Sequence, residues 1–379
     1  MKNSSDYIFA HYFLKSKTTL WDAANNIAIG QSIGNPNIRN SWETDDLYEQ
    51  HGCKIIGDPQ GTEGKVTIAF PKVNLDIQED GISQLMCFLM GGHLDIDIIE
   101  ECHLLDVDFN FELHKPKIGL SGLRALTGHY DKPLLGGIIK PKTGITPYQL
   151  LDMVKQLVDG GVDFIKEDEI LGNPACCKLT DRLKVLQPYL NQQKVVYCYC
   201  INGDYPYCVN RASQVAEAGG NGVHINVWCG LGVYKSIREM NLPIFIHFQK
   251  SGDRIFTSDR HNHHVDWYVV AKLAALMGAD SIHAGMWGGY SSDDSCELAR
   301  CLSVLRSSNV TPALSCGMHP GLVNKVTELF GPDYIANVGG AIHGHLGGTL
   351  AGVKAMRQAI DGTFGPEYDG AIKQWGLVS

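Results

Sequence analysis

The sequence predicts an α/β fold in which a C-terminal (β/α)8 barrel, a TIM barrel, follows a smaller α+β domain. Eight short apolar runs alternate with helical patterns over about 250 residues, which is the length and repeat of such a barrel. The runs are continuously apolar, as strands buried on both faces require. A doubly wound sheet also alternates strands and helices, but it usually has fewer units. The runs cover residues 134–139, 162–165, 195–201, 223–227, 243–246, 281–282, 312–314 and 335–338.

Helix signals lie between these runs. Residues 146–149 provide a threonine N-cap, a proline at the first helical position and a glutamine that completes a capping box. Gly160, Gly278 and Gly331 stand where helix C-termini are expected, because glycine readily adopts the backbone conformation that ends a helix. These signals support a regular succession of strand and helix.

The region before the barrel has no such repeat. Residues 6–15 and 65–71 have the pattern of strands, and residues 21–29 and 83–90 have the pattern of helices. This mixture predicts an α+β domain. We place its end at residue 120, which gives a first domain of residues 1–120 and a barrel domain of residues 121–379.

The composition excludes several classes of protein. The chain has 379 residues and a net charge of −9, without any block of lysine or arginine, so nucleic acid and anionic membranes are not expected partners. No apolar run approaches the roughly 20 residues of a membrane-spanning helix, and the chain starts without the apolar core of a signal peptide. Twelve cysteines without a Cys-x-x-Cys pair are expected to be mostly buried, reduced thiols, which favours a cytoplasmic protein.

Polar residues or glycines stand at the end of every predicted strand. In a TIM barrel the chemistry gathers at these C-terminal strand ends, and a purely structural protein has no reason to place polar groups there. The pattern therefore favours an enzyme. The residues at the strand ends are Lys140, Lys142, Lys166, Asp168, Glu169, Asn202, Asn226, His247, His283, Ser315, Gly339 and Gly340.

The strongest local signal is Asp-Phe-Ile-Lys-Glu-Asp-Glu at residues 163–169. Strand periodicity places Lys166 and Asp168 on one face, with Glu169 where the strand becomes a loop. Two carboxylates beside a lysine form a salt-bridge cluster or a metal site, and the catalytic end of a barrel favours the metal. Mg²⁺ prefers six oxygen ligands, which two carboxylates alone do not supply. A lysine that has combined with CO₂ is an anionic carbamate, and it would add a third oxygen ligand.

Two motifs resemble the paired signature of the RuBisCO large subunit. They are Gly-Gly-Ile-Ile-Lys-Pro-Lys at residues 136–142 and Gly-Val-Asp-Phe-Ile-Lys-Glu-Asp-Glu at residues 161–169. The likeness continues through Ser-Ile-His-Ala-Gly at residues 281–285, Ser-Cys-Gly at residues 315–317 and Gly-Gly at residues 339–340. It covers all the predicted barrel strands and, more faintly, the N-terminal domain. The chain is therefore identified as a member of the RuBisCO superfamily, similar to the RuBisCO-like proteins of form IV.

The resemblance implies a metal centre and a pair of catalytic lysines. Lys166 would be carbamylated by CO₂ and would share Mg²⁺ with Asp168 and Glu169. Lys140 matches the family's lysine that moves protons at the enolate, and Lys142 matches the lysine that tunes its surroundings. Mg²⁺ and CO₂, bound as the carbamate, are thus the expected cofactors.

The resemblance also implies the substrate contacts. His247 matches a catalytic histidine that contacts the substrate near the metal, and His283 matches a distal phosphate site to which Ser315 also belongs. The expected substrate is a phosphorylated small molecule. In the family's basic dimer the partner's N-terminal domain completes each active site, which implies a homodimer or a multiple of dimers. The glycines whose backbone amides would bind the other phosphate are Gly317, Gly339 and Gly340.

Several positions depart from the family pattern. Tyr290 replaces the lysine that the carboxylase brings onto CO₂ from the loop after strand six. Phe248 replaces an arginine that clamps the second phosphate, and Ile138 replaces a threonine near the first catalytic lysine. In the N-terminal domain, Gly92 and Gln31 stand in place of an active-site asparagine and glutamate. The remaining groups are suited to abstracting a proton beside a carbonyl and stabilising the enolate.

The sequence therefore favours Mg²⁺-dependent enolisation of a monophosphorylated ketose or keto acid, by an enolase or isomerase that does not fix CO₂. Three alternatives stay open: decarboxylation of a branched 3-keto sugar-acid phosphate, true ribulose-bisphosphate carboxylation, and a non-catalytic regulatory role. Tyr290 and Phe248 argue against the carboxylase. The intact lysines and metal ligands argue against a protein without activity.

Two other features receive structural interpretations. His-Asn-His-His at residues 261–264 resembles a metal cluster, but polar runs just before a helix are usually solvated. Cys198 and Cys200 alternate along a predicted strand, and burial is expected for both rather than metal binding or redox chemistry.

Overall fold

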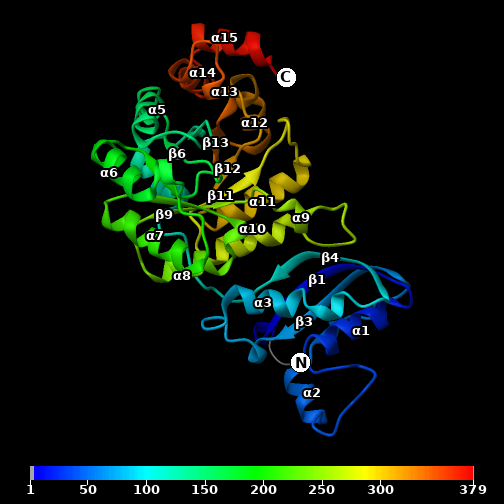
Figure 1. Cartoon of the computed structure of the whole chain (residues 1–379). Coiled ribbons are helices and arrows are strands. Elements are labelled where there is room, and N and C mark those ends of the chain that lie inside the picture. Colours follow the sequence, from blue (N-terminus) through cyan, green and yellow to red (C-terminus); the bar gives the residue numbers. More distant parts are fainter. Residues whose placement is uncertain (1–3, 379) are drawn as a thin grey trace. The chain divides into compact units, whose positions relative to one another are not determined.

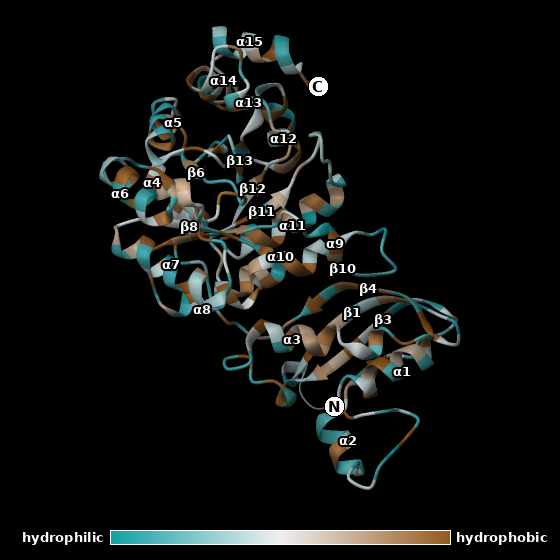
Figure 2. Ribbon diagram, in the orientation of Figure 1, coloured by the Kyte–Doolittle hydropathy of each residue, from teal (hydrophilic) through white to brown (hydrophobic). Residues whose placement is uncertain are grey.

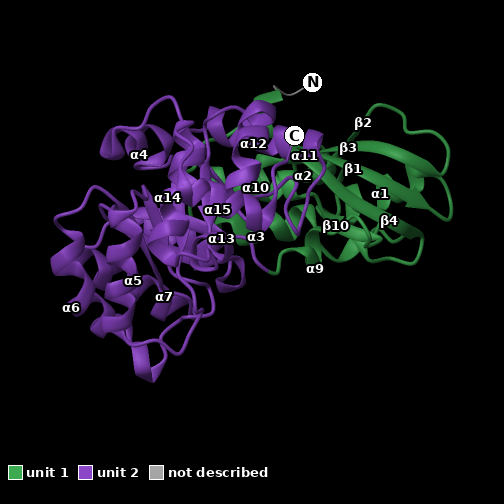
Figure 3. Ribbon diagram, turned by 90° about the horizontal axis from the view of Figure 1, so that it is seen from above, with its two compact units in different colours: residues 1–113, 252–276 green, residues 114–251, 277–379 purple. Residues whose placement is uncertain are grey.

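The computed structural model describes residues 4–378. The chain forms two compact units (Figure 3). One contains the residues up to 113 together with residues 252–276, and the other contains residues 114–251 and those from 277 onward. These units differ from the single division expected at residue 120 in two ways. The boundary between them comes earlier, before α4 (Gly119–Thr127), and residues 252–276 belong to the first unit rather than to the barrel. The second difference arises because β10 (His263–Val265) pairs with β4 (Ile99–Asp108).

Eight parallel strands close the barrel of the second unit, in the order β11-β12-β13-β5-β6-β7-β8-β9 (Figure 1). Each predicted apolar run overlaps one of these strands, so the predicted (β/α)8 barrel is confirmed. The strands are β5 (Leu134–Ile138), β6 (Phe164–Lys166), β7 (Val196–Cys200), β8 (Gly222–Asn226), β9 (Phe245–Gln249), β11 (Ser281–Gly285), β12 (Thr311–Leu314) and β13 (Ile335–Val338).

Helices follow the strands and surround the barrel (Figure 1). The first of them, α5 (Pro147–Asp159), starts with the predicted capping box, in which the Thr146 hydroxyl accepts from the Gln149 N–H and the Gln149 side chain accepts from the Thr146 N–H. Gly160 and Gly331 end α5 and α12 as predicted. Besides α4 and α5, the α-helices of this unit are α6 (Leu179–Leu190), α7 (Tyr205–Glu217), α8 (Gly232–Glu239), α11 (Ser295–Ser307), α12 (Val323–Phe330), α13 (Gly340–His343), α14 (Thr349–Asp361) and α15 (Pro366–Trp375).

A hydrophobic core fills the barrel near the N-terminal ends of its strands. Most of its buried side chains come from the first residues of strands, and Leu123 of α4 joins them, with Ile118 and Leu120 packed against the cluster. Burying one such aliphatic or aromatic side chain stabilises the fold by roughly 1.5–3 kcal/mol. This layer closes one end of the barrel and leaves the C-terminal strand ends for polar groups. Its members are Leu123, Leu134, Phe164, Val196, Cys198, Phe245, Ala313 and Ile335.

The first unit is built on a five-stranded sheet of order β10-β4-β1-β3-β2. Buried and partly exposed residues alternate along β1 (Tyr7–Ser16), so the sheet has one buried face. The helices α1 (Leu20–Gly30) and α3 (Gly81–Leu89) overlap the two predicted helices, which confirms the α+β domain. Figure 2 shows hydrophobic and hydrophilic residues mixed along α1, as a helix with one buried face requires. The remaining elements are β2 (Lys54–Ile56), β3 (Glu63–Pro71), α2 (Asp45–His51), α9 (Arg254–Thr257) and α10 (Trp267–Leu276).

The second half of the histidine-rich segment belongs to this sheet. Its interpretation as a solvated run is therefore right for His261 and Asn262, which are exposed, and wrong for His264, which is buried. Residues 263–265 form β10 and pair in parallel with residues 102–104 of β4. The His264 ring stacks on His103, with ring centroids 4.1 Å apart. Backbone pairing occupies residues 263–265, and stacking covers the His264 ring, so the polar sequence does not keep these residues in solvent.

The cysteines are all free, and most of them are buried. Cys198 and Cys200 are fully buried, as predicted, whereas Cys87 is exposed although it stands in an apolar run. Within residues 4–378, no helix has the length and apolar character that crossing a membrane requires.

Candidate active site

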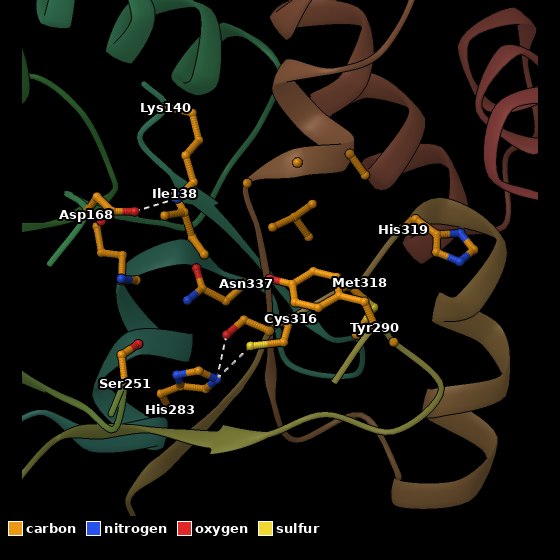
Figure 4. A pocket seen from close by; sticks show the side chains of 18 of the residues that line it. Ile138, Lys140, Asp168, Ser251, His283, Tyr290, Cys316, Met318, His319 and Asn337 are labelled. Carbon is orange, nitrogen blue, oxygen red and sulfur yellow. Dashed lines mark hydrogen bonds and ion pairs between the residues drawn. The ribbon is translucent and has the colours of Figure 1, made fainter. Parts of the chain in front are cut away.

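A cavity of about 410 Å³ lies at the C-terminal ends of the barrel strands, within the second unit (Figure 4). Its walls come from the segments that follow β5, β6, β9, β11, β12 and β13. The fold thus brings together every predicted site residue except His247. The predicted residues that line the cavity are Lys140, Lys142, Lys166, Asp168, Glu169, His283, Ser315, Gly317, Gly339 and Gly340.

Two lysine–carboxylate pairs lie in this cavity. Lys166 ends β6 and is only 2% exposed, and its Nζ lies 3.2 Å from Oε2 of Glu169. Lys140, which follows β5, pairs with Asp168. Each carboxylate is thus neutralised by an ammonium, as charges removed from water require. Burial alone would raise the pKa of Glu169, but the Lys166 ammonium and several hydrogen bonds outweigh it and lower that pKa to about 2.

The residues present fit the predicted metal centre only if Lys166 is modified. Among residues 4–378, no group of three or more His, Cys, Asp or Glu residues is arranged to hold a metal ion. Asp168 and Glu169 offer two carboxylates, and the Lys166 amine lies within hydrogen-bond distance of the second. A carbamate on Lys166 would replace a cation with an anionic oxygen donor. Three hard anionic ligands would then hold Mg²⁺.

A buried ion pair between Glu167 and Arg182 fixes the segment that carries Asp168 and Glu169, from the side away from the cavity. Glu167 is fully buried, and its carboxylate accepts from the Tyr197 hydroxyl at 2.9 Å and from the Cys200 N–H at 2.6 Å. It also pairs with Arg182 of α6, which donates in addition to the Gly172 carbonyl. Arg182 therefore holds the chain on both sides of the two cavity carboxylates. Sequence reasoning missed Arg182, because the residues around it do not indicate that it pairs with Glu167.

Glycines line another part of the cavity. Gly317 has φ 117°, and a Cβ there would lie 2.6 Å from the backbone nitrogen of Tyr290, so only glycine lets the two turns approach this closely. A Cβ at Gly340 would meet nothing within 4 Å, so this position opens onto free space. Turns of this kind bind anions through backbone N–H groups, and the arrangement is consistent with the predicted phosphate site.

A hydrogen-bonded chain of neutral side chains lines a further part of the cavity. Gln249 Nε2 lies 3.3 Å from His283 Nδ1, and His283 Nε2 lies 2.7 Å from the Ser315 hydroxyl oxygen. Burial, with added repulsion from nearby lysines, holds the pKa of His283 well below its usual value, so the imidazole is neutral. Sequence reasoning missed Gln249, although it alternates with His247 on β9 and so faces the barrel interior.

Strand β9 places two predicted positions outside the cavity. His247 is fully buried and does not line the cavity, and its Nδ1 lies 3.1 Å from the Ser281 hydroxyl oxygen. Burial, followed by the charge of a nearby lysine, lowers its pKa to about 3. Phe248 is also fully buried, and it stacks on Tyr234 of α8 with centroids 4.7 Å apart. The residue that lines the cavity from the end of this strand is Gln249, so Phe248 does not lie where an arginine could clamp a phosphate in this cavity.

Asn337 is a second residue that sequence reasoning missed. It lies on β13, lines the cavity and is 1% exposed, and within residues 4–378 neither atom of its amide has a hydrogen-bond partner. Tyr290 also lines the cavity, but 86% of it is exposed. Trp287, earlier in the same loop, is partly buried and does not line the cavity.

Known proteins share this architecture. The family described as ribulose bisphosphate carboxylase large chain, catalytic domain, matches residues 119–307 and 303–374. A ribulose bisphosphate carboxylase of Pyrococcus furiosus is 28% identical over 405 residues, which cover 98% of this chain and 95% of the relative. A 2,3-diketo-5-methylthiopentyl-1-phosphate enolase of Bacillus pumilus is 30% identical over 391 residues, which cover 94% of each chain.

Solved structures of the same family have the same fold as this chain. The octameric ribulose-1,5-bisphosphate carboxylase/oxygenase of Pyrococcus horikoshii superposes with a TM-score of 0.91 at 26% identity, covering 100% of this chain and 96% of that one. The relatives thus include proteins named as carboxylases and proteins named as enolases. The match extends over the whole barrel, including the segments that carry the cavity lysines and carboxylates. This chain therefore belongs to the ribulose bisphosphate carboxylase large-chain family.

Proposed function

We propose that this protein is a RuBisCO-like enolase or isomerase, which enolises a monophosphorylated ketose or keto acid with Mg²⁺ and does not fix CO₂. The proposal depends above all on one observation, which is that lysines, two carboxylates and several glycines line a single cavity. It is further supported by a relative named as an enolase, which matches nearly the whole chain.

Enolisation needs a group that takes a proton from carbon and a charge that stabilises the developing enolate oxygen. When bound, Mg²⁺ supplies that stabilisation as a Lewis acid. Lys140 is our candidate for moving the proton, since its side chain lines the cavity and remains 31% exposed. It would take the proton as the free amine, so the ammonium that pairs with Asp168 would first have to give up its own proton. The exposed Lys142 adds positive charge at the same wall, where it would attract a phosphate.

Carboxylation makes a further demand that this cavity does not meet. Negative charge then develops on the added CO₂, and a preorganised cationic donor at that place is worth about 3–4 kcal/mol. Tyr290 offers a neutral hydroxyl in the loop where the carboxylase has its lysine. Enolisation does not require that cation, so it is expected to persist where carboxylation fails.

We also propose that the protein assembles as a homodimer or a multiple of dimers. The relative from Pyrococcus horikoshii is an octamer, and it matches this chain over its whole length. Light scattering of the purified protein measures the assembly directly, and a monomeric mass would contradict this part of the proposal.

The test of the proposed function is proton exchange. The protein is incubated in D₂O with Mg²⁺, bicarbonate and a panel of ketose monophosphates and keto-acid phosphates, and deuterium at carbon is detected by NMR. We expect exchange with at least one compound, loss of exchange when EDTA removes the metal, and loss in Lys140→Met. Lys155→Met, at an exposed position of α5, is the matched control and is expected to exchange normally. No exchange with any compound, or exchange that survives in Lys140→Met, would contradict the proposal.

A further inference from the structure

We propose that Cys208 and Cys229 form a dithiol site, which a small-molecule disulfide such as oxidised glutathione converts into an intramolecular disulfide. Cys208 lies on α7, and Cys229 ends the short 3₁₀ helix Val227–Cys229 that follows β8. Both cysteines are free thiols, and neither lines the cavity. The site is therefore separate from the groups of the cavity, and it does not depend on the proposed function.

The two thiols meet at the turn that follows β7. Cys208 Sγ lies 3.3 Å from the Ile201 carbonyl oxygen, and Cys229 Sγ lies 3.6 Å from Oδ1 of Asn202, the next residue. The thiols are also within hydrogen-bonding reach of each other. A disulfide forms without backbone strain only where the two side chains already lie close together. Two thiols held at one turn meet this requirement.

The surroundings favour Cys229 as the sulfur that reacts first. It is partly exposed, whereas Cys208 is fully buried. The hydrogen bond from Cys208 lowers the pKa of Cys229 to about 6, and Arg211, which donates to the Asn202 carbonyl oxygen at the same turn, adds to this effect. Most of Cys229 is therefore the nucleophilic thiolate at neutral pH. The same hydrogen bond, together with burial, raises the pKa of Cys208, which remains a thiol.

Oxidation of this pair consists of two thiol–disulfide exchanges. The Cys229 thiolate attacks one sulfur of glutathione disulfide, which breaks that S–S bond, releases a glutathione thiolate and leaves the other glutathione bound to Cys229. Cys208 then gives its proton to the released thiolate and attacks Sγ of Cys229, which expels the second glutathione as a thiolate. Two protein sulfurs are oxidised, and one glutathione disulfide is reduced to a thiol and a thiolate, so electrons and protons balance.

Other cysteines differ from this pair in burial or in exposure. Cys198 and Cys200 are fully buried on β7, and burial raises the pKa of both thiols, which keeps them unreactive. Cys296 is exposed on α11, so it can react with glutathione disulfide and remain as the mixed disulfide. At Cys229 the mixed disulfide is expected to be short-lived, because the Cys208 thiol is beside it.

Redox titration with peptide mapping tests the site. The full-length protein is equilibrated at about pH 7 with mixtures of reduced and oxidised glutathione, and the remaining thiols are blocked with N-ethylmaleimide. Peptides are then analysed by mass spectrometry without reduction. We expect a peptide pair that is joined through Cys208 and Cys229 and is two hydrogen masses lighter than the two separate peptides. Dithiothreitol is expected to reverse the linkage completely.

Substitutions separate the two roles. In Cys208→Ser the second exchange is blocked, so Cys229 is expected to keep a stable glutathione adduct. In Cys229→Ser the buried Cys208 is expected to stay unmodified. Cys296→Ser, at the exposed position of α11, is the control and is expected to form the linkage as the wild type does. The rate at which iodoacetamide alkylates Cys229 is expected to rise with pH around a midpoint of about 6, well below that of an ordinary thiol.

Three outcomes would overturn the assignment. Cys208 and Cys229 could both carry N-ethylmaleimide even in the most oxidising mixture, or the wild type could accumulate only the mixed disulfide at Cys229. Either cysteine could also be found linked to a different cysteine. Circular dichroism checks that the variants fold, and the map of the wild type decides the question if Cys208→Ser does not. Proton exchange has no part in this test, so its failure would refute the proposed function and leave the dithiol site standing.

Discussion

Replacing Arg182 with methionine tests how the segment that carries the cavity carboxylates is held. Arg182 and Glu167 are both fully buried, so Arg182→Met leaves a carboxylate without its cation. Breaking a buried pair costs about 3–5 kcal/mol of unfolding free energy. The Tyr197 hydroxyl and the Cys200 N–H still donate to Glu167, which places the loss near the lower end of that range. The lost bond to the Gly172 carbonyl adds about 0.5–1.5 kcal/mol, so we expect a total of roughly 3.5–4.5 kcal/mol.

Urea denaturation, monitored by circular dichroism, measures this loss, provided that the slope of the unfolding free energy against urea concentration is the same in the variant and the wild type. Glu167→Gln and the double variant complete a cycle. The double variant contains no unpaired buried charge, so its loss is expected to be smaller than the sum of the single losses. A loss below about 1 kcal/mol in Arg182→Met, or additive losses in the double variant, would refute the reasoning.

Three further predictions concern the cavity. Lys166→Ala is expected to lose Mn²⁺ binding, measured by electron paramagnetic resonance, together with proton exchange, and retained binding would contradict the carbamate ligand. Cys316→Gly is expected to raise the free energy of unfolding by about 1 kcal/mol, because Cys316 has φ 81°, and a lower thermal midpoint would contradict this. Ribulose bisphosphate and labelled bicarbonate are expected to give no acid-stable label, and turnover within about tenfold of an ordinary carboxylase would refute the exclusion of CO₂ fixation.

The barrel could be predicted because strands buried on both faces leave continuous apolar runs. The run at residues 335–338 matches β13 at both ends, and the cavity lysines and carboxylates follow such runs directly. The fifth run was predicted at residues 243–246, but β9 spans Phe245–Gln249. Two polar residues of its second half face the barrel interior, where His247 is buried and Gln249 lines the cavity. The apolar pattern therefore indicated only the first half of the strand.

The missed residues depend on contacts between distant segments. Arg182 gains its role from Glu167, and local sequence shows neither the pair nor its burial. Asn337 differs from other strand residues because the fold buries its amide without a hydrogen-bond partner among the described residues. The spacing of residues in the sequence does not indicate such burial. Strand β10 is short and polar, and it forms because β4 offers a free edge for backbone pairing. In each case the deciding information is the position of a partner far away in the chain.

Proton exchange and metal affinity, measured side by side in the wild type and in Lys140→Met, test most directly whether this cavity is an enolising site. Lys140 pairs with Asp168 but supplies no oxygen ligand, so the variant is expected to bind Mn²⁺ at least as tightly as the wild type. Its exchange rate on the best ketose phosphate is expected to fall by about 10²–10⁴-fold, the usual contribution of a positioned proton-transfer group. Full metal affinity together with an unchanged exchange rate would contradict the assignment of Lys140 and, with it, the proposed chemistry of the cavity.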